Sequence, residues 1–491
     1  MSTKPSRDIF DALTLSWSRR RAQVARWLRG VLMGFRCGGA TAMTEAGRPE
    51  SVVLPPSRSG RPSASDGANG SVLETWTPGG SGSALALARG LAAIAVGGGV
   101  ALLAWTVRWS WGIGILLSLP VFWAACGSRA EAGCLYLSYL LAGTHDLPSI
   151  IARFFPALPA AAAIGLWLAT AIVLAVPWIV LWRRQMRPLR AASGCAVAVL
   201  LVTLPPLGFV GWLSPITLGG QLFPGFGFAG AALTWMMLAV LAGASRLGAA
   251  RAAAAVSVLL AGVGMIALLA NLMYVQPRAP DGWRSLDTHV GRYPPAGDLV
   301  GRLAWHQALT DAVSGELADR TLRVLVLPEE ILGQQDPVVA AAWSSIGAEA
   351  RARGVTVLAG VDLPRPGGGY LDALWELTAG SRVLPAARVP MPLGQWRPWS
   401  AESSPTNLSL GQAELVGARP VGVSFCFEDF LFWVQALTML GQRPEVLLSV
   451  ANNWFDAGAD AQHIQARHIE LWARLWGLPL IRATNWGENP E

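Results

Sequence analysis

The chain has little lysine, histidine, cysteine or charge for its length. Its 491 residues include one lysine, Lys4, five histidines and five cysteines, and charged residues make up 14%. The cysteines have no paired spacing and three of them lie in apolar runs, which argues against a disulfide framework or a zinc site. No metal or cofactor is expected. A mean hydropathy of +0.41 excludes a wholly soluble protein, so part of the chain is expected in a membrane.

Long apolar runs fill much of the first half of the chain. Most are near the ~20 residues that a helix needs to cross a bilayer. They predict a transmembrane domain over 83–274 with about seven spans, at 83–106, 109–127, 131–146, 157–182, 191–212, 222–244 and 250–274. The third run is short and is the one expected to be tilted or re-entrant.

The segment 1–82 precedes these runs and differs from them in composition. Residues 9–36 combine apolar and Arg positions in a pattern typical of a helix on a membrane surface, or equally of a solvated basic tail. Residues 38–82 are rich in Gly, Ser and Pro, which predicts a disordered linker.

Arginine positions predict the orientation of the spans. The net charge of +7 is carried almost entirely by Arg, and the groups at 129, 183–190 and 246–251 fall on the side of the N-terminal tail in a seven-span arrangement. The positive-inside rule makes that side cytoplasmic, so residues 275–491 are expected in the periplasm, with the spans in a bacterial inner membrane. Because topology accounts for the Arg residues, direct nucleic-acid binding is not expected.

Residues 275–491 alternate between apolar strands and helices. Strands are predicted at 321–327, 355–361, 370–377, 421–425, 446–450 and 478–483, and helices at 336–354, 429–440 and 460–476. Such alternation is typical of a layered α/β domain whose site lies at the C-terminal ends of the strands.

Two reactive side chains fall at predicted strand ends. Glu329 follows Leu327 and Pro328, and Cys426 follows the strand at 421–425. A thiol and a carboxylate are the parts of a cysteine nucleophile with its general base. The alternatives are a cysteine that only packs and an acid that is merely solvated beside its neighbour Glu330.

Five motifs in order resemble the carbon–nitrogen hydrolase (nitrilase) superfamily: Pro328-Glu329, the stretch 388–396, Cys426-Phe-Glu428, Asn452-Asn-Trp454, and the segment 462–485. With the apolar runs before them, they resemble the membrane branch typified by apolipoprotein N-acyltransferase. The Pro-rich stretch that ends in Trp396-Arg-Pro-Trp399 is similar to the TraB proteins of plasmid conjugal transfer. The resemblance implies a polytopic α-helical membrane domain followed by a nitrilase-like α/β domain, an α-β-β-α sandwich.

The same resemblance implies roles for individual residues. Cys426 would attack an acyl carbon to give a thioester, and Glu329 would take the thiol proton. Arg388 would supply a positive charge for the developing oxyanion, and Glu428 would orient the site. The residues of these motifs that are expected to bind substrate are Gln395, Trp396, Asn452 and Trp454.

The sequence departs from the superfamily at three places. The family's catalytic lysine matches Ala387 or Arg388, and an arginine keeps the charge but has too high a pKa to deliver a proton. Gln395 stands where the acyltransferases have glutamate. The chain ends soon after Asn485, so its last domain is expected to be short of the final strands and helix.

These observations predict two alternative functions. The first is acyl or amide transfer through a cysteine thioester, with a membrane lipid or other acyl donor as partner, in plasmid conjugal transfer. The second is a catalytically impaired scaffold that associates with conjugation or lipoprotein components. A transporter is disfavoured because the spans contain few ionisable residues.

Overall fold

The structure is a computed structural model that describes residues 80–109, 111–366, 368–379, 382–397, 399–400, 403–411, 413–455 and 460–487. The chain divides into two units, Met1–Ala86 and Leu87–Glu491. The predicted basic helix at 9–36 lies outside the described residues, as does most of the predicted linker. Helix α2 begins at Gly80, three residues before the predicted start of the membrane domain.

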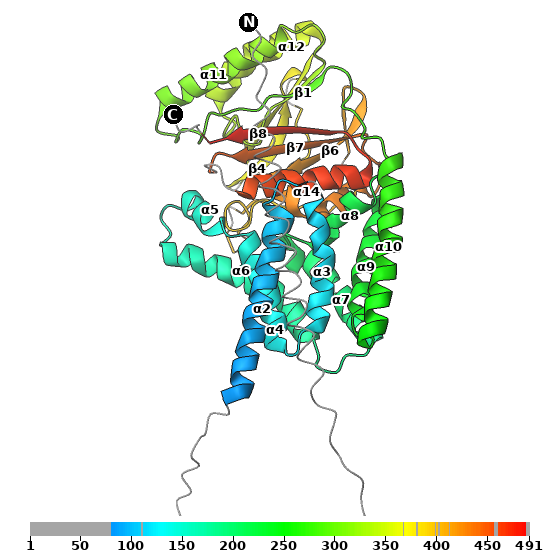
Figure 1. The fold of residues 1–491 in the computed structure, drawn as a ribbon. Coiled ribbons are helices and arrows are strands. Elements are labelled where there is room, and N and C mark those ends of the chain that lie inside the picture. Colours follow the sequence, from blue (N-terminus) through cyan, green and yellow to red (C-terminus); the bar gives the residue numbers. More distant parts are fainter. Residues whose placement is uncertain are drawn as a thin grey trace, which may run out of the picture. The chain divides into compact units, whose positions relative to one another are not determined.

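The first part of the described chain is entirely helical (Figure 1). Its elements are α2 (Gly80–Trp105), η1 (Gly112–Leu117), α3 (Ser118–Ala125), α4 (Arg129–Gly143), α5 (Leu147–Phe154), α6 (Ala160–Leu181), α7 (Pro188–Thr203), η2 (Leu207–Val210), η3 (Pro215–Thr217), α8 (Leu218–Leu222), α9 (Gly227–Ala244) and α10 (Ala249–Met273). Every predicted apolar run overlaps at least one of these helices. The fifth run is shorter than predicted, because α7 ends at Thr203, just before Pro205 and Pro206 remove two backbone donors.

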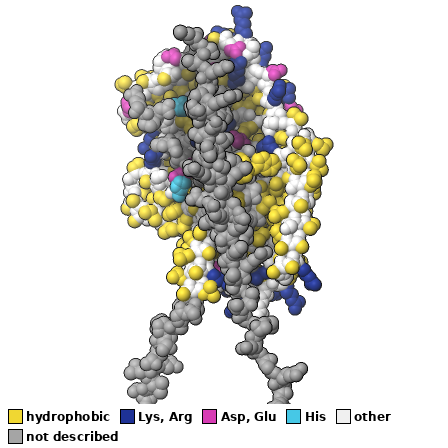
Figure 2. Space-filling model, viewed as in Figure 1, with side chains coloured by type: hydrophobic (Ala, Val, Ile, Leu, Met, Phe, Trp, Pro, Cys, Tyr) yellow, Lys and Arg dark blue, Asp and Glu magenta, His cyan; other side chains and the backbone are white. Residues whose placement is uncertain are grey.

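Four helices among the described residues are long and apolar enough to cross a membrane: Ala84–Trp105, Ala160–Leu181, Gly227–Ala244 and Ala249–Met273. In α10 only Ala267 is buried, and Figure 2 shows hydrophobic side chains along its outward face with basic side chains at its lower end. A helix that exposes apolar residues along its length is suited to lipid. The chain is therefore membrane-associated, while the number of spans and their orientation stay predictions.

The second part is an α/β domain with two four-stranded sheets. One sheet has the order β1-β2-β3-β4, with β1 (Trp283–Ser285), β2 (Val324–Val326), β3 (Thr356–Pro364) and β4 (Tyr370–Glu376). The other has the order β5-β6-β7-β8, with β5 (Glu414–Val416), β6 (Arg419–Phe425), β7 (Val446–Asn453) and β8 (Leu480–Trp486). Within each sheet three neighbouring strands are parallel and the edge strand β4 or β5 is antiparallel.

Three buried clusters show that the domain has four layers. Apolar residues of α11 (Leu299–Leu317) and α12 (Pro337–Arg353) pack with one face of the first sheet. The two sheets face each other through a second cluster that includes Val326, Leu358 and Phe425. A third cluster joins the outer face of the second sheet to α14 (Asp460–Trp476) and to the helical part, and Figure 1 shows α14 running between the two. The layer order α-β-β-α is the one that the sequence predicts.

Most predicted elements are present, with shifted ends. Helix α12 has Asp336 as its N-cap and Gly354 in the left-handed conformation as its C-cap, and α14 has the predicted limits. The predicted helix 429–440 is instead a 3-10 turn, η5 (Cys426–Phe430), followed by α13 (Phe432–Met439). Helix α11 was not predicted, because its buried face includes Arg302 and His306, which interrupt the apolar pattern.

Trp472 on α14 is expected to contribute strongly to stability. Its side chain is fully buried, and its indole N–H donates to the carbonyl oxygen of Asp429 at 3.0 Å. Trp472→Ala should lower the free energy of unfolding by about 3–5 kcal/mol because it leaves a cavity. Denaturant unfolding in detergent, followed by circular dichroism, measures this. Trp399→Ala is the control, since Trp399 is 73% exposed; equal losses would contradict the expectation.

Candidate active site

The thiol of Cys426 lies where β6 ends. The backbone of Cys426 has φ of 29°, in the left-handed region that non-glycine residues seldom adopt. The chain turns there directly from β6 into η5. Strained backbone of this kind is concentrated at functional sites, where it fixes the direction of a reactive side chain.

Glu329 reaches the same place from the first sheet. It follows β2 and Pro328, is buried, and accepts a hydrogen bond at 3.1 Å on Oε2 from the backbone N–H of Asn452 at the end of β7. Burial raises the pKa of the Cys426 thiol to about 12, while hydrogen bonds from the Asn452 backbone and with Glu329 act to lower it. A carboxylate in contact with a partly buried thiol is placed to take its proton.

A polar network behind the thiol holds the turn in position. Gln465 on α14 donates to the carbonyl oxygen of Cys426 at 2.8 Å and to Asp429 at 3.1 Å. Asp429 also accepts from Ser424 and Ser449, and Gln465 accepts from Asn453. The thiol itself lies 3.9 Å from Oδ1 of Asn453. Because every member has partners, the network is expected to be rigid.

Glu428 connects the loop at Arg388 and Val389 to the turn that carries Cys426. Its carboxylate accepts backbone N–H bonds from Arg388, from Val389 at 2.8 Å and from Phe425 at 3.1 Å. Burial raises the pKa of Glu428 to about 7, and these backbone hydrogen bonds lower it in part. Its position fits the predicted orienting role, which stays a prediction.

The side chain of Arg388 is directed elsewhere. Its guanidinium donates from Nη1 to the carbonyl oxygens of Ser409 and Asn407, and its buried Nη2 has no hydrogen-bond partner among the described residues. The sequence predicts a guanidinium beside the sulfur of Cys426. None of these hydrogen bonds joins the Arg388 guanidinium to Cys426. Ala387, the other residue that matches the lysine, is buried and has no charge to offer.

The four residues expected to bind substrate have other contacts. Gln395 donates to Glu330 at 2.6 Å, and Trp396 stacks on Phe209. The side chain of Asn452 accepts from Asn485 at 2.8 Å, and Trp454 packs edge-on against Phe154. None of the four is among the residues that line the cavity described next. Their role in substrate binding stays a prediction.

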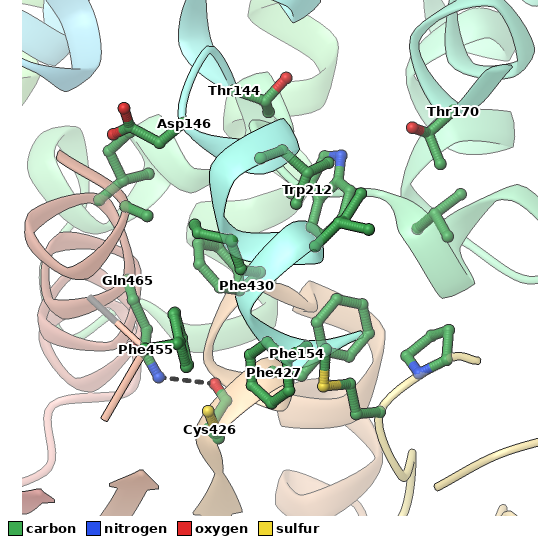
Figure 3. Close-up of a pocket in the computed structure, with 18 of the residues that line it drawn as sticks. Thr144, Asp146, Phe154, Thr170, Trp212, Cys426, Phe427, Phe430, Phe455 and Gln465 are labelled. Carbon is green, nitrogen blue, oxygen red and sulfur yellow. Dashed lines mark hydrogen bonds between the residues drawn. The ribbon is translucent and has the colours of Figure 1, made fainter. Parts of the chain in front are cut away.

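An apolar cavity of about 350 Å³ reaches Cys426. One wall comes from the loop after α4 and from α5 and α6, and another from η2 and the residues that follow it; the side chains include Ile151, Phe154, Leu166, Val210 and Leu213. Figure 3 shows Phe427, Phe430 and Phe455 between Cys426 and two residues in turns of the helical part, Thr144 and Trp212. The cavity therefore joins the thiol to the membrane-associated helices.

Two groups of acids near the site were not predicted to act there. Asp372 is buried, and Glu330 and Asp362 are partly buried, in one group with Glu329; the detectable signal was an Asp within each of two apolar strands, β3 and β4. At the other end of the cavity, His145, Asp146 and Asp460 have potential metal-ligating atoms within 4.8 Å of one another. Asp146 already accepts the backbone N–H of Asp460, so nothing in this group requires a metal.

The described residues define a membrane-associated protein in which an α-β-β-α domain, with a thiol and a carboxylate at its strand ends, is joined to apolar helices. Solved structures similar to part of the chain include a carbon–nitrogen hydrolase from Helicobacter pylori, with 16% identity, a TM-score of 0.29, and coverage of 41% of this chain and 72% of that one. Another is a nitrilase-superfamily amidase from Nesterenkonia, with 16% identity, a TM-score of 0.30, and coverage of 43% and 80%.

Curated relatives identify the family. Conjugal transfer protein TraB of Agrobacterium fabrum is 32% identical over 382 residues, which cover 74% of this chain and 86% of the relative. Probable conjugal transfer protein TraB of Sinorhizobium fredii is 28% identical, over 77% of this chain and 95% of the relative. No family model matches. The chain belongs to the TraB family of conjugal transfer proteins, which confirms the resemblance seen in the sequence.

Proposed function

We propose that this protein transfers an acyl group through a thioester on Cys426 during plasmid conjugal transfer. The observation that carries the proposal is the apolar cavity that ends at a strained cysteine whose thiol contacts a buried glutamate. A cavity with apolar walls and a few polar groups at one end is the usual form of a site for a largely apolar ligand.

The chemistry has two steps. The sulfur of Cys426 bonds to the acyl carbon of an ester, its proton passes to Glu329, and the alcohol leaves with a proton returned by Glu329. An amine then attacks the thioester, gives a proton to Glu329, and releases the sulfur, which is reprotonated. The products are an alcohol and an amide, and the protein is unchanged.

The acyl donor is a membrane lipid in this proposal. The walls of the cavity come from α4 to α6, and α6 is one of the helices long and apolar enough to cross a membrane. An acyl chain entering between these helices would leave the bilayer without crossing water. The arginine pattern favours the inner membrane with the α/β domain in the periplasm.

Phospholipid is expected to leave an acyl mass increment on Cys426. The full chain is incubated with phospholipid vesicles, digested and analysed by mass spectrometry. Cys426→Ala should abolish the increment. Cys134→Ala is the matched control, because Cys134 on α4 is also a free, partly buried cysteine and its loss should leave the adduct unchanged. Absence of any adduct on Cys426 would reject the proposal.

A scaffold without catalysis is the second candidate. It is favoured by Ala387 at the position of the lysine and by the direction of the Arg388 guanidinium. A thiol-reactive acyl probe separates the candidates, because an enzyme requires Glu329 as its base. Equal labelling of the wild-type protein and Glu329→Gln would support the scaffold.

A further inference from the structure

Asp372 is a buried acid for which the proposed chemistry has no role. It lies in the middle of β4 and is 2% exposed. It pairs in register with Asp362 on β3. Leu374, two residues further along β4, belongs to the core between the sheets. Side chains alternate along a strand, so Asp372 also points into the layer between the sheets.

The partners of Asp372 decide its protonation. Its carboxyl group lies close enough to the carboxyl group of Glu329 for a hydrogen bond between them when one of the two is protonated, and its two buried oxygens accept no hydrogen bond from any donor among the described residues. Two carboxylates repel each other, so this bond exists only when one of them carries a proton. Glu329 accepts the N–H of Asn452 as well, which favours the charge on Glu329.

We infer that Asp372 is a positioning residue that keeps its proton at neutral pH and donates it in a hydrogen bond to Glu329, so that Glu329 is the charged member of the pair and the base for Cys426. The family's catalytic lysine matches Ala387 or Arg388; Ala387 has no charge, and the guanidinium of Arg388 donates to Ser409 and Asn407. The backbone of Ala387 donates to the carbonyl oxygen of Asp372 at 2.8 Å, so the neutral residue lies beside the acid.

Burial and neighbouring charges raise the pKa of both carboxyl groups, and the interaction between them raises the pKa of Asp372 further and lowers the pKa of Glu329. The groups that act on Asp372 are Glu329 and Glu330 after β2, and Glu428 in η5; Asp362 opposes it from β3. Burial and then these like charges raise the pKa of Asp372 well above its usual range. Arg388 lies near Glu428, but its guanidinium donates to Ser409. A neutral Asp372 therefore avoids an additional buried negative charge.

The inference rests on the proposed function for its catalytic part, but the protonation of Asp372 is testable without activity. An acid that is neutral when folded and ionised when unfolded binds one more proton in the folded state, so its contribution to stability falls as pH rises from its unfolded pKa towards its folded pKa. Asp372→Asn has no such proton. Its folding equilibrium constant relative to wild type should therefore rise about tenfold per pH unit from about pH 5 upwards, until the pH reaches the folded pKa of Asp372.

Asp336→Asn is the control for this measurement. Burial raises the pKa of Asp336, but bonds from Arg302 and backbone N–H groups outweigh it and leave the pKa below its usual value. It is ionised in both states over this range, so its difference from wild type should not change with pH. A pH-independent difference for Asp372→Asn would overturn the inference.

The catalytic part is tested with a chromogenic acyl ester on the full chain in detergent. Asp372→Asn supplies an amide donor to Glu329 and should acylate Cys426 within about threefold of wild type, whereas Asp372→Leu has similar size and no donor. Loss of a hydrogen bond to a charged group should slow Asp372→Leu about 10- to 100-fold at pH 7. Equal rates for the two variants would overturn the role of Asp372. No acylation of wild type would reject the proposed function and leave the pH measurement to decide the protonation.

Discussion

Glu329→Gln is expected to slow labelling of Cys426 by a thiol-reactive acyl probe about 10²- to 10⁴-fold, the range that a general base contributes. The thiol pKa is raised to about 12 by burial, although its contacts with Asn452 and Glu329 lower it in part, so almost no thiolate exists at pH 7 without a base. Glutamine keeps the shape and removes the proton acceptor. Time courses of probe incorporation, read by mass spectrometry, give the rates.

Glu330→Gln is the matched control for this experiment. Glu330 is the next residue and is partly buried, but it accepts from Gln395 and interacts with Asp362 rather than with the thiol. Its substitution should change the labelling rate far less than Glu329→Gln. A comparable loss in both variants would mean that the acid cluster as a whole, and not Glu329, controls the thiol.

Sequence reasoning selected the proposed nucleophile and base because each follows a recognisable local pattern. An apolar strand followed by Pro-Glu, and another followed by Cys-Phe-Glu, identify strand ends without any knowledge of the sheets. The strands β2 and β6 belong to two sheets that pack face to face, and Glu329 and Cys426 meet where these strands end.

The same reasoning could not predict the orientation of side chains where that orientation depends on tertiary contacts. Arg388 matches a catalytic position in register, yet its guanidinium bonds to carbonyl groups of a loop about twenty residues further along the chain. Asp372 looks like one charged residue in a strand, and its meaning depends on an acid from a different strand end. Both outcomes are set by which segments fold beside each other, and a linear pattern does not contain that information.

The length of the acyl chain is expected to have the second large effect. If the chain occupies the apolar cavity beside Cys426, each buried CH₂ contributes about 0.8 kcal/mol, or roughly fourfold in kcat/KM. A series of acyl esters should therefore react faster with each added carbon until the cavity of about 350 Å³ is filled. Rates that do not depend on chain length would show that the substrate does not use this cavity.

A bulky residue in the cavity wall should shift the limit of that series. Ile151 on α5 lines the cavity. In Ile151→Trp the rate is therefore expected to stop rising at a shorter acyl chain than in the wild type. The rate with an acetyl ester should stay near that of wild type. Ile172→Trp adds the same volume on α6 at a site that is 51% exposed and does not line the cavity. It should leave the whole series unchanged. The rate with the acetyl ester reports on the thiol, and the rates with long esters report on the cavity. A loss of rate confined to long acyl chains therefore shows that the cavity is obstructed while the nucleophile is intact.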